Sequence, residues 1–401
     1  MKVLFIVTAF QRHEKDVITP WLLETIKSLG DLGIEVTVFA PSYRGLADHT
    51  IKGIPVKRFR YFFRRWENLT HEETTPDRLK RGLFYKGLVA FYVLGGMIGI
   101  MRLCARERYD IIHVHWPFPH ALFGYLGRWM CGGRLVCTFY GVELQWVLNK
   151  MPAFRPFLKW AARVSDEVVA ISSYTAAMLR NVEDVPIRVI PYGISVRELS
   201  PPVRRSSGPA TILFVGRLVE RKGVAFLIDA FQNLCRSSDV RLVIVGDGPE
   251  RRALEQRARS RGIEGEVRFV GQVEADRLKE WYRASDIFVL PAVFDSKGDT
   301  EGLGVVLLEA LSHGKAVIAS RVGGIVDIVE DGKTGLLVEE KDATALARAI
   351  ERLLSDHELY RHIVEEGQKR VRERFLIGAV AGRLAETYGA RTTARTPEST
   401  D

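Results

Sequence analysis

The chain has 401 residues, which is enough for two domains of ordinary size, each with its own hydrophobic core. Hydrophobic residues make up 47% of the chain and charged residues 27%, which is typical of a globular protein and excludes a fibrous or largely disordered one. The formal charge of +9, from 58 Lys and Arg against 49 Asp and Glu, favours anionic partners. Nucleotide phosphates, anionic lipids and nucleic acid all remain open at this point.

The cysteines and the first residues indicate a cytoplasmic protein. No CxxC pair and no zinc spacing occurs among the four cysteines, so reduced thiols are expected and metal ligation by cysteine is not. The opening run MKVLFIVTAF turns charged at Arg12 and is too short for a signal peptide. It predicts a first buried strand instead.

Short runs rich in Val and Ile alternate with longer helical patterns, which predicts parallel sheets covered by helices. The segment 199–210, LSPPVRRSSGPA, has the composition of a linker. We therefore expect an α/β domain at 1–198, a second at 211–372, a helix at 373–388 that packs back on the first domain, and a disordered tail at 389–401. The expected strands are 2–10, 33–41, 110–115, 134–141, 167–172 and 188–193 in the first half, and 210–216, 241–248, 267–273, 286–293, 316–324 and 334–338 in the second.

The stretch EGLGVVLLE places a glycine-bearing turn and an apolar helix between two carboxylates, Glu301 and Glu309. Turn residues Gly302, Leu303 and Gly304 lead into the helix, and the glycines allow backbone N–H groups to approach a ligand. The positive end of the helix would face an anion such as a diphosphate. Eight helical residues rise about 12 Å, so the two carboxylates would reach hydroxyl groups at both ends of that diphosphate.

Two cations follow the first strand of the second half, in GRLVERKG. Arg217 and Lys222 lie where a strand gives way to a helix, a position that suits a diphosphate leaving group. A solvated basic loop would have the same composition. The later segment VGDGPER has Gly246 and Gly248 but no third glycine, which argues against a dinucleotide fingerprint and an oxidoreductase.

These motifs together resemble the donor-binding region of the retaining glycosyltransferases of family 4, which have a GT-B fold of two Rossmann-like α/β domains facing across a cleft. The resemblance is specific from about residue 211 to 340. It implies transfer of a sugar from a nucleoside diphosphate without a metal or other cofactor. The implied catalytic residues are Arg217, Lys222 and Glu301; the implied donor-binding residues are Gly216, Gly246, Gln272, Val273, Gly302, Leu303, Gly304 and Glu309, with the ribose at Glu309 and the nucleobase beside Gln272.

The first half departs from the family at two loops. Tyr140 stands where many members have a histidine that touches the sugar, and a tyrosine with its ordinary pKa of about 10 does not shuttle protons near neutrality. A charged loop with Arg12 and His13 replaces the double glycine after the first strand. We expect these residues and His115, from the HxH pair of the third strand, to contact acceptor or sugar. A hydrogen-bonded core role is the alternative for His115, and solvation for the loop.

A basic and aromatic segment, RFRYFFRRW at 58–66, predicts docking on an anionic membrane. The uncharged run 87–101 that follows has 15 residues, too few to span a bilayer, and predicts a buried or interfacial helix. A nucleic-acid partner is not expected, because no nucleic-acid-binding motif occurs. An ordinary solvated surface with inward-facing rings is the alternative to membrane docking.

The sequence thus predicts a cytoplasmic transferase, peripheral on the inner face of the membrane, with a nucleotide-sugar donor and a lipid-linked or polysaccharide hydroxyl acceptor. Two other functions remain open. One is transfer to a small soluble acceptor such as a sugar phosphate, and the other is a non-catalytic binding protein with the same fold. Asp295 and Asp299 in the loop before Glu301 are expected to contact sugar hydroxyls or solvent, because their spacing is not that of a DxD metal site.

Overall fold

We describe a computed structural model of the chain, in which residues 1–401 are placed except 17, 73–77, 197–198, 202–207, 236–238 and 390–401. The chain forms two compact units. It leaves the first after Gly193 and returns to it at Ile377. Unit 1 consists of Met1–Ile171, Thr175–Gly193 and Ile377–Asp401, and unit 2 of Ser172–Tyr174 and Ile194–Leu376.

Unit 1 is built on an eight-stranded sheet in the order β3-β4-β2-β1-β5-β6-β7-β8. All neighbouring strands are parallel except β3 and β4, which form an antiparallel hairpin at one edge. The alternation of apolar runs and helices therefore produces the expected parallel sheet. The strands are β1 Lys2–Ile6, β2 Glu35–Pro41, β3 His49–Ile51, β4 Ile54–Phe59, β5 Ile111–His115, β6 Arg134–Phe139, β7 Glu167–Ala170 and β8 Ile187–Val189.

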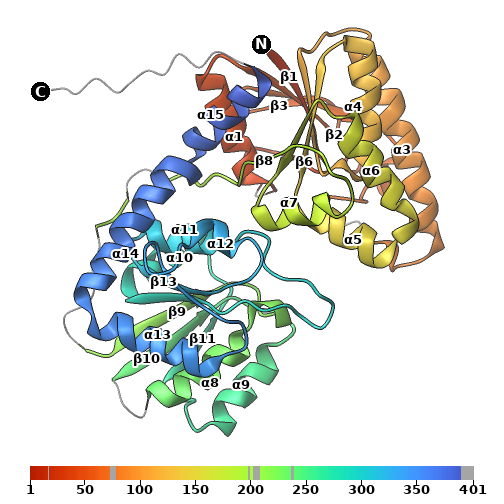
Figure 1. The fold of residues 1–401 in the computed structure, drawn as a ribbon. Helices are drawn as coiled ribbons and strands as arrows, with labels where there is room; N and C mark the ends of the chain where they lie inside the picture. The colour runs from red at the N-terminus through yellow and green to blue at the C-terminus, as the bar shows by residue number, and fades with distance from the viewer. Residues whose placement is uncertain (17, 73–77, 197–198, 202–207, 236–238, 390–401) are drawn as a thin grey trace, which may run out of the picture. The chain divides into compact units, whose positions relative to one another are not determined.

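Helices cover this sheet on both faces (Figure 1), with α1 packed against α15 and α4 packed against both α3 and α6. Two separate clusters of buried apolar side chains result, as expected for a central sheet in a doubly covered α/β unit. The helices are α1 Pro20–Asp31, α3 Leu83–Cys104, α4 Pro117–Cys131, α5 Val142–Lys150, α6 Arg155–Val164, α7 Ser173–Arg180 and α15 Ile377–Tyr388, with short turns of 3-10 helix at Arg64–Trp66 and Pro152–Phe154.

Unit 2 repeats the plan with a six-stranded, all-parallel sheet in the order β11-β10-β9-β12-β13-β14. Its strands are β9 Ala210–Val215, β10 Val240–Val245, β11 Val267–Gly271, β12 Ile287–Leu290, β13 Ala316–Ser320 and β14 Leu336–Val338. Its helices are α8 Val224–Leu234, α9 Arg251–Ser260, α10 Ala275–Ala284, α11 Val305–Ser312, α12 Ile325–Ile328, α13 Ala343–Ser355 and α14 His357–Arg370, with short helical turns at Glu220–Lys222 and Val371–Phe375.

All twelve strands expected from the sequence are present, but the hairpin of β3 and β4 was not expected. The strand β4 reads IPVKRF, in which a proline and two cations obscure the apolar pattern that the other strands show. The chain contains Arg58 within this strand, so the basic and aromatic segment begins inside the sheet rather than in a surface loop.

The segment that connects the two units differs from the expected linker. The chain changes unit between Gly193 and Ile194, whereas residues 202–207 of the expected linker lie outside the described residues. Ser200 is already bound to unit 2, since its N–H donates to the carbonyl of Ser312 and its own carbonyl accepts from Gln368. The returning helix begins at Ile377 rather than 373, and the expected tail lies outside the described residues from 390 onward.

Candidate active site

Unit 2 has a cavity of about 380 Å³ where β9, β10 and β11 end. This volume falls in the range that small-molecule sites occupy, and the carboxyl ends of parallel strands are where ligands bind in open α/β sheets. Four of the predicted donor-binding residues line it, two of them glycines, together with the predicted catalytic residue Arg217. The lining residues are Val215, Gly216, Arg217, Val245, Gly246, Asp247, Gln272, Val273 and Leu278.

Glycines after strand β10 allow close backbone packing beside this cavity. Gly246 has φ 131°, and a Cβ on it would lie 1.9 Å from the carbonyl oxygen of Gly216. Gly248 is equally restricted, because its Cβ would lie 2.3 Å from the carbonyl oxygen of Leu218. These two glycines therefore allow the β9 and β10 turns to pack backbone to backbone, and the sequence motif VGDGP has this structural role.

A group of charged side chains lies beside the cavity, where Lys222 approaches Gly216. A Cβ on Gly216 would lie 3.6 Å from Cε of Lys222, whose ammonium group forms an ion pair with the carboxylate of Glu301. Arg221 reaches the same carboxylate at 3.5 Å and also lies 3.7 Å from Asp299. Lys222 and Glu301 were both predicted as site residues, and the structure brings them into direct contact.

The charge of Glu301 is fixed by these cations. Burial, the largest single effect, would raise the pKa of this carboxyl group. The charges of Lys222 and Arg221, with hydrogen bonds from Lys222 and the backbone N–H of Gly304, outweigh burial and hold the pKa of Glu301 below its usual value. Glu301 is therefore ionised at neutral pH and accepts hydrogen bonds only.

Glu309 lies on α11, five residues into the helix that Gly304 opens with φ 89°. Its carboxylate accepts a hydrogen bond of 2.7 Å from the hydroxyl of Tyr282, whose ring stacks on His313. Burial raises the pKa of Glu309, although the Tyr282 hydrogen bond opposes this. Since Leu278 lines the cavity one helical turn before Tyr282, helix α10 connects Glu309 to the cavity wall.

The loop before α11 is held by close backbone packing. A Cβ on Gly323 would lie 2.1 Å from the carbonyl oxygen of Glu301, and one on Gly324 would lie 2.0 Å from that of Gly302. The N–H of Gly324 also donates to the carbonyl of Glu301 at 3.0 Å. The glycine pair thus packs directly against the backbone of Glu301, Gly302 and Leu303 at the start of this loop.

Asp295 closes the preceding loop. One of its carboxylate oxygens accepts from the backbone N–H groups of Lys297 and Asp299, at 2.8 and 2.9 Å. This is a turn-stabilising role of a kind that aspartate often has. No three His, Cys, Asp or Glu side chains are grouped as metal ligands in the described part of the chain.

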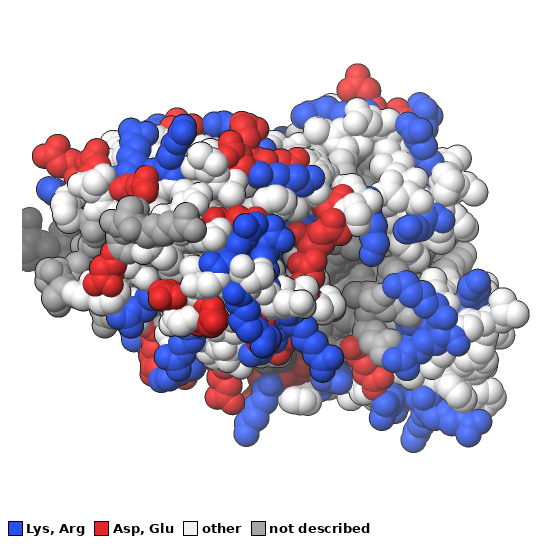
Figure 2. All heavy atoms as spheres, turned by 90° about the horizontal axis from the view of Figure 1, so that it is seen from below, with Lys and Arg blue, Asp and Glu red and all other residues white. Residues whose placement is uncertain are grey.

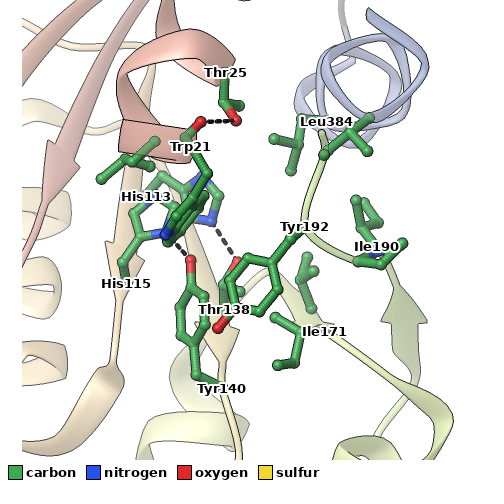
Figure 3. A pocket seen from close by; sticks show the side chains of 15 residues that line it. Trp21, Thr25, His113, His115, Thr138, Tyr140, Ile171, Ile190, Tyr192 and Leu384 are labelled. Carbon is green, nitrogen blue, oxygen red and sulfur yellow. Dashed lines mark hydrogen bonds between the residues drawn. The ribbon is translucent and has the colours of Figure 1, made fainter. Parts of the chain in front are cut away.

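Unit 1 has a different arrangement at the ends of β5 and β6 (Figure 3). The Nδ1 of His115 is 2.6 Å from the hydroxyl of Tyr140, and His113 bonds Thr138 at 2.7 Å and Tyr388 at 2.6 Å. Trp21 and Tyr192 come from other segments to pack their rings against Tyr140. The residues gather around a cavity of only about 20 Å³, which is room for about one water molecule.

Burial determines the protonation of this network. It lowers the pKa of His113 to about 3 and that of His115 well below its usual value, so both rings are neutral near pH 7. Burial also raises the pKa of Tyr140 well above 10, so the hydroxyl keeps its proton. Within unit 1, His115 and Tyr140 are interior residues hydrogen-bonded to each other beside this small cavity, and a contact of either with acceptor or sugar stays a prediction.

The charged loop after β1 is organised by Arg12. Its guanidinium bonds the carboxylate of Asp16 at 2.6 Å and lies over the ring of Tyr43, 5.0 Å from the centroid. His13 is exposed in the same loop and offers its backbone carbonyl to the N–H of Asp16. This loop is therefore a folded turn with its basic side chain held at the surface.

The segment 58–66 was predicted to contact a membrane, and for the buried residues of its first half this prediction is wrong. Arg58 is buried, and burial lowers its pKa to about 10. Its guanidinium donates to the carbonyls of Phe10, Gln11 and Pro41, so it ties loops of unit 1 together. Phe59 and Tyr61 are also buried, and Arg60 pairs with Glu67. Arg60 remains exposed in the first half of the segment, and Phe63, Arg64 and Arg65 are exposed in the second half.

Several site residues were not found from the sequence. Arg221 adjoins Lys222 and was interpreted only as part of a solvated loop. Tyr282 lies 27 residues before Glu309 in the chain, and His313 lies four residues after it. Leu278 has no motif of its own, and in VGDGPER only the glycines beside Asp247 were interpreted. For Leu278 the signal lies in the fold, since helix α10 packs beside β9 and brings this residue to the strand ends.

Solved glycosyltransferases share this fold. Sucrose-phosphate synthase from Thermosynechococcus elongatus superposes with a TM-score of 0.72 at 24% identity, covering 97% of this chain and 98% of that one. HepE of Anabaena, solved with UDP and glucose, gives a TM-score of 0.67 at 19% identity over 97% and 99% of the two chains. The two parallel-sheet α/β units are thus those of the GT-B class of glycosyltransferases.

Sequence comparison defines the family. The model of Glycosyltransferase Family 4 matches residues 20–198, and that of Glycosyl transferases group 1 matches residues 196–370. The N-acetyl-alpha-D-glucosaminyl L-malate synthase of Bacillus anthracis is 30% identical over 71% of this chain and 75% of its own length. A GDP-mannose-dependent alpha-(1-6)-phosphatidylinositol monomannoside mannosyltransferase of Mycolicibacterium smegmatis is 28% identical over 90% and 92%. The chain belongs to glycosyltransferase family 4, and it is a glycosyltransferase.

Proposed function

We propose that this enzyme transfers a hexose, with retention of configuration, from a nucleoside-diphosphate sugar to a hydroxyl group of a lipid-linked or polysaccharide acceptor. One observation carries the proposal: a cavity of about 380 Å³ at the strand ends of unit 2 lies beside buried Lys222 and ionised Glu301. Its size suits a nucleotide, and the cation beside it suits a diphosphate.

Each side chain has a role in this proposal. Arg217 and Lys222 bind the diphosphate, with Lys222 exchanging its partner Glu301 for a phosphate oxygen, and Glu301 then accepts hydrogen bonds from hydroxyls of the sugar. Glu309, held by Tyr282, accepts from the ribose, while Gln272 and Val273 lie beside the base. Gly216, Gly246, Gly302, Leu303 and Gly304 form the backbone that surrounds the donor.

The reaction breaks the bond between the anomeric carbon and the diphosphate oxygen, and its electron pair stays on the diphosphate. The acceptor oxygen bonds to the same face of the anomeric carbon, and its proton passes to the departing diphosphate. Arg217 and Lys222 stabilise the negative charge that develops on the leaving group. Tyr140 transfers no proton in this scheme, because burial keeps its hydroxyl protonated.

The phosphatidylinositol monomannoside mannosyltransferase and this chain align over more of both lengths than the L-malate synthase and this chain do. We therefore favour a lipid-linked acceptor over a small soluble one. The L-malate synthase relative supports the soluble alternative. We place the enzyme in the cytoplasm, peripheral on the inner face of the membrane. On the face shown in Figure 2, basic and acidic side chains are interspersed over much of the surface, so the net charge alone does not mark a docking site there.

A donor screen tests the function. The purified enzyme would be incubated with UDP-, GDP- and ADP-sugars, and release of the nucleoside diphosphate and the anomeric form of the released sugar would be measured by NMR. We expect slow hydrolysis of one donor class, with the initial product in the donor's own configuration. Absence of both binding and release for every donor would instead support a non-catalytic binding protein, and an inverted product would overturn the retaining mechanism.

Independence from metal is a separate part of the proposal. If Arg217 and Lys222 supply the positive charge at the diphosphate, turnover with the preferred donor persists in EDTA. The control is the same assay with magnesium added back. Loss of activity in EDTA that magnesium or manganese restores would contradict this part and would direct attention to Asp295 and Asp299.

A further inference from the structure

Exposed apolar side chains are concentrated on one helix of unit 1. Among the described residues, fourteen large hydrophobic side chains are exposed, and six of them lie on α3, whereas unit 2 has one, Val326. The six are Leu83, Phe84, Phe91, Leu94, Ile98 and Met101, with exposures from 38% to 81%. Such a concentration is unusual for a surface bathed in water and marks an interaction face.

The spacing of these residues places them in one stripe. Positions 84, 91, 94, 98 and 101 are separated by seven, three, four and three residues, so these five side chains lie on the same side of the helix, and Leu83 adjoins them at its start. No charged residue interrupts the sequence between Lys86 and Arg102. From Leu83 to Met101 the stripe extends for about 27 Å.

The second half of the segment 58–66 enlarges this face. The ring of Phe62 lies 5.0 Å from that of Phe91, and the ring of Trp66 lies 4.7 Å from that of Phe84. Phe63 is 73% exposed next to them. Aromatic rings from a separate segment therefore extend the apolar surface at the N-terminal half of α3.

Basic side chains flank the stripe at both ends. Exposed Arg64 and Arg65 adjoin the aromatic cluster, and Lys86 and Arg102 lie at the two ends of the uncharged run on α3 itself. Between residues 78 and 108 the chain has seven Lys or Arg and a single acidic residue, Glu107. An apolar centre with cationic ends complements an anionic bilayer, in which the acyl region takes the centre and the headgroups take the ends.

The opposite face of α3 holds the helix on unit 1. Tyr92 and Ile100 are buried in the core, and a Cβ on Gly96 would lie 2.2 Å from the ring of Phe123. The helix is long and apolar enough to cross a bilayer by length and composition, with a mean hydropathy of 1.8. Crossing would pull Tyr92 and Ile100 out of the core, so this packing favours a helix that lies in the membrane surface.

We propose that unit 1 docks on anionic membrane through the exposed stripe of α3 and the adjoining Phe62, Phe63 and Trp66, with α3 parallel to the bilayer surface. The inference concerns the partner of this face and does not rest on the transferase reaction. It differs from docking through residues 58–66 alone, because α3 provides most of the apolar area.

Vesicle co-sedimentation tests the proposal without an activity assay. The full chain would be mixed with vesicles of phosphatidylglycerol and phosphatidylcholine at low salt, with pure phosphatidylcholine in parallel. The variant Leu94→Gln/Ile98→Gln removes the centre of the stripe with good helix formers, and Leu32→Gln/Val326→Gln removes two exposed apolar side chains elsewhere. We expect the first variant to lose about tenfold or more in partitioning and the second to match the parent chain.

A second variant, Arg64→Gln/Arg65→Gln, tests the charged part and stays informative if the α3 variant unfolds in a thermal melt. It should weaken binding to the anionic vesicles and leave the small binding to pure phosphatidylcholine unchanged. A parent chain that stays in the supernatant with anionic vesicles at low salt would overturn the proposal. So would equal binding by all variants, or a dimer in solution that the Leu94→Gln/Ile98→Gln variant dissociates, since the face would then be occupied by a second copy.

Discussion

The same structural position, the carboxyl end of a parallel sheet, is open in unit 2 and filled in unit 1. In unit 2, Gly216 follows β9, Gly246 follows β10 and Gly271 ends β11. A cavity of about 380 Å³ lies at these strand ends. In unit 1 the strands β5 and β6 lead into His115 and Tyr140, whose surroundings leave about 20 Å³. Small residues at the strand ends of unit 2 and large ones in unit 1 thus accompany this difference in cavity volume.

The two positions also differ in charge. The unit 2 site has an exposed arginine, Arg217, and an ion pair of Lys222 with Glu301, which are groups that bind anions and hydroxyls. In unit 1 the ionisable groups His113, His115 and Tyr140 are held neutral by burial. Two sheets of the same architecture therefore differ in their chemistry, since in unit 1 these groups form buried hydrogen bonds with one another and with neighbouring side chains.

The largest expected effect comes from the cations of unit 2. Lys222→Ala and Arg217→Ala should each lower kcat by about a hundred- to a thousandfold, because charge developing on the diphosphate loses a preorganised partner. Release of nucleoside diphosphate measures this. Lys333→Ala, which removes an exposed lysine of the same unit, is the control. Full activity in either site variant would remove that residue from the catalytic group.

Acid should destabilise unit 1 before unit 2. Burial lowers the pKa of His71 and His113 to about 3 and that of His120 to about 4, while His115 is shifted further. The unfolded chain takes up protons below about pH 6.5 that the folded unit does not, so the free energy of unfolding falls as pH drops from about 6.5 toward 4.

One group in unit 1 opposes this trend. Burial raises the pKa of Glu143 to about 7, so its contribution to stability is complete below about pH 4.5 and is lost as pH rises through 7. Four histidines outweigh one carboxyl group. Tryptophan fluorescence against pH is the measurement, since unit 1 has every tryptophan of the chain except Trp281. Unfolding of unit 2 at higher pH than unit 1, detected by hydrogen exchange, would contradict the prediction.

The sequence predicted most of the fold for a physical reason. Buried parallel strands such as 241–248 have no polar face, so they appear as continuous apolar runs that need no knowledge of their neighbours. The strand β4 was not predicted, because Lys57 and Arg58 interrupt its apolar run. Arg58 is buried only because three carbonyls from other loops accept from it, and no local pattern reveals such partners.

The site was predictable where the motif is local. Arg217, Lys222 and Glu301 lie in short, glycine-marked loops, and the structure places them near the ends of neighbouring strands of one sheet. The partner of Glu309 was not predictable, because Tyr282 reaches it from a helix 27 residues away. The interior position of His115 and Tyr140 also depends on Trp21 and Tyr192, which approach from distant segments.

A side chain at Gly246 should disturb the turn that lines the unit 2 cavity. Gly246→Ala places a Cβ 1.9 Å from the carbonyl oxygen of Gly216 at φ 131°, so the turn must shift. We expect a loss of about 1 to 3 kcal/mol in the free energy of unfolding and weaker nucleotide binding. Gly265→Ala, with no atom within 4 Å of its Cβ, is the control in the same unit. Equal melting curves for the two variants would show that the turn tolerates a side chain.

The smallest expected effect concerns the ribose. Glu309→Ala should weaken nucleotide affinity about ten- to hundredfold, which corresponds to the roughly 1.5 to 3 kcal/mol of a charge-assisted hydrogen bond. Titration calorimetry measures it, and Glu366→Ala, on helix α14 of the same unit, is a control. A folded Glu309→Ala variant that binds nucleotide as tightly as the parent chain would exclude Glu309 from the site.

Hydrogen exchange with and without nucleoside diphosphate tests the central claim most directly. The claim is that the nucleotide binds where β9, β10 and β11 of unit 2 end. We predict that the largest protection falls on residues 215–223, 245–248 and 271–274, and that 113–116 and 138–141 of unit 1 change less. The largest protection at 113–116 and 138–141, with no change at 215–223, would contradict the assignment of the donor site to unit 2.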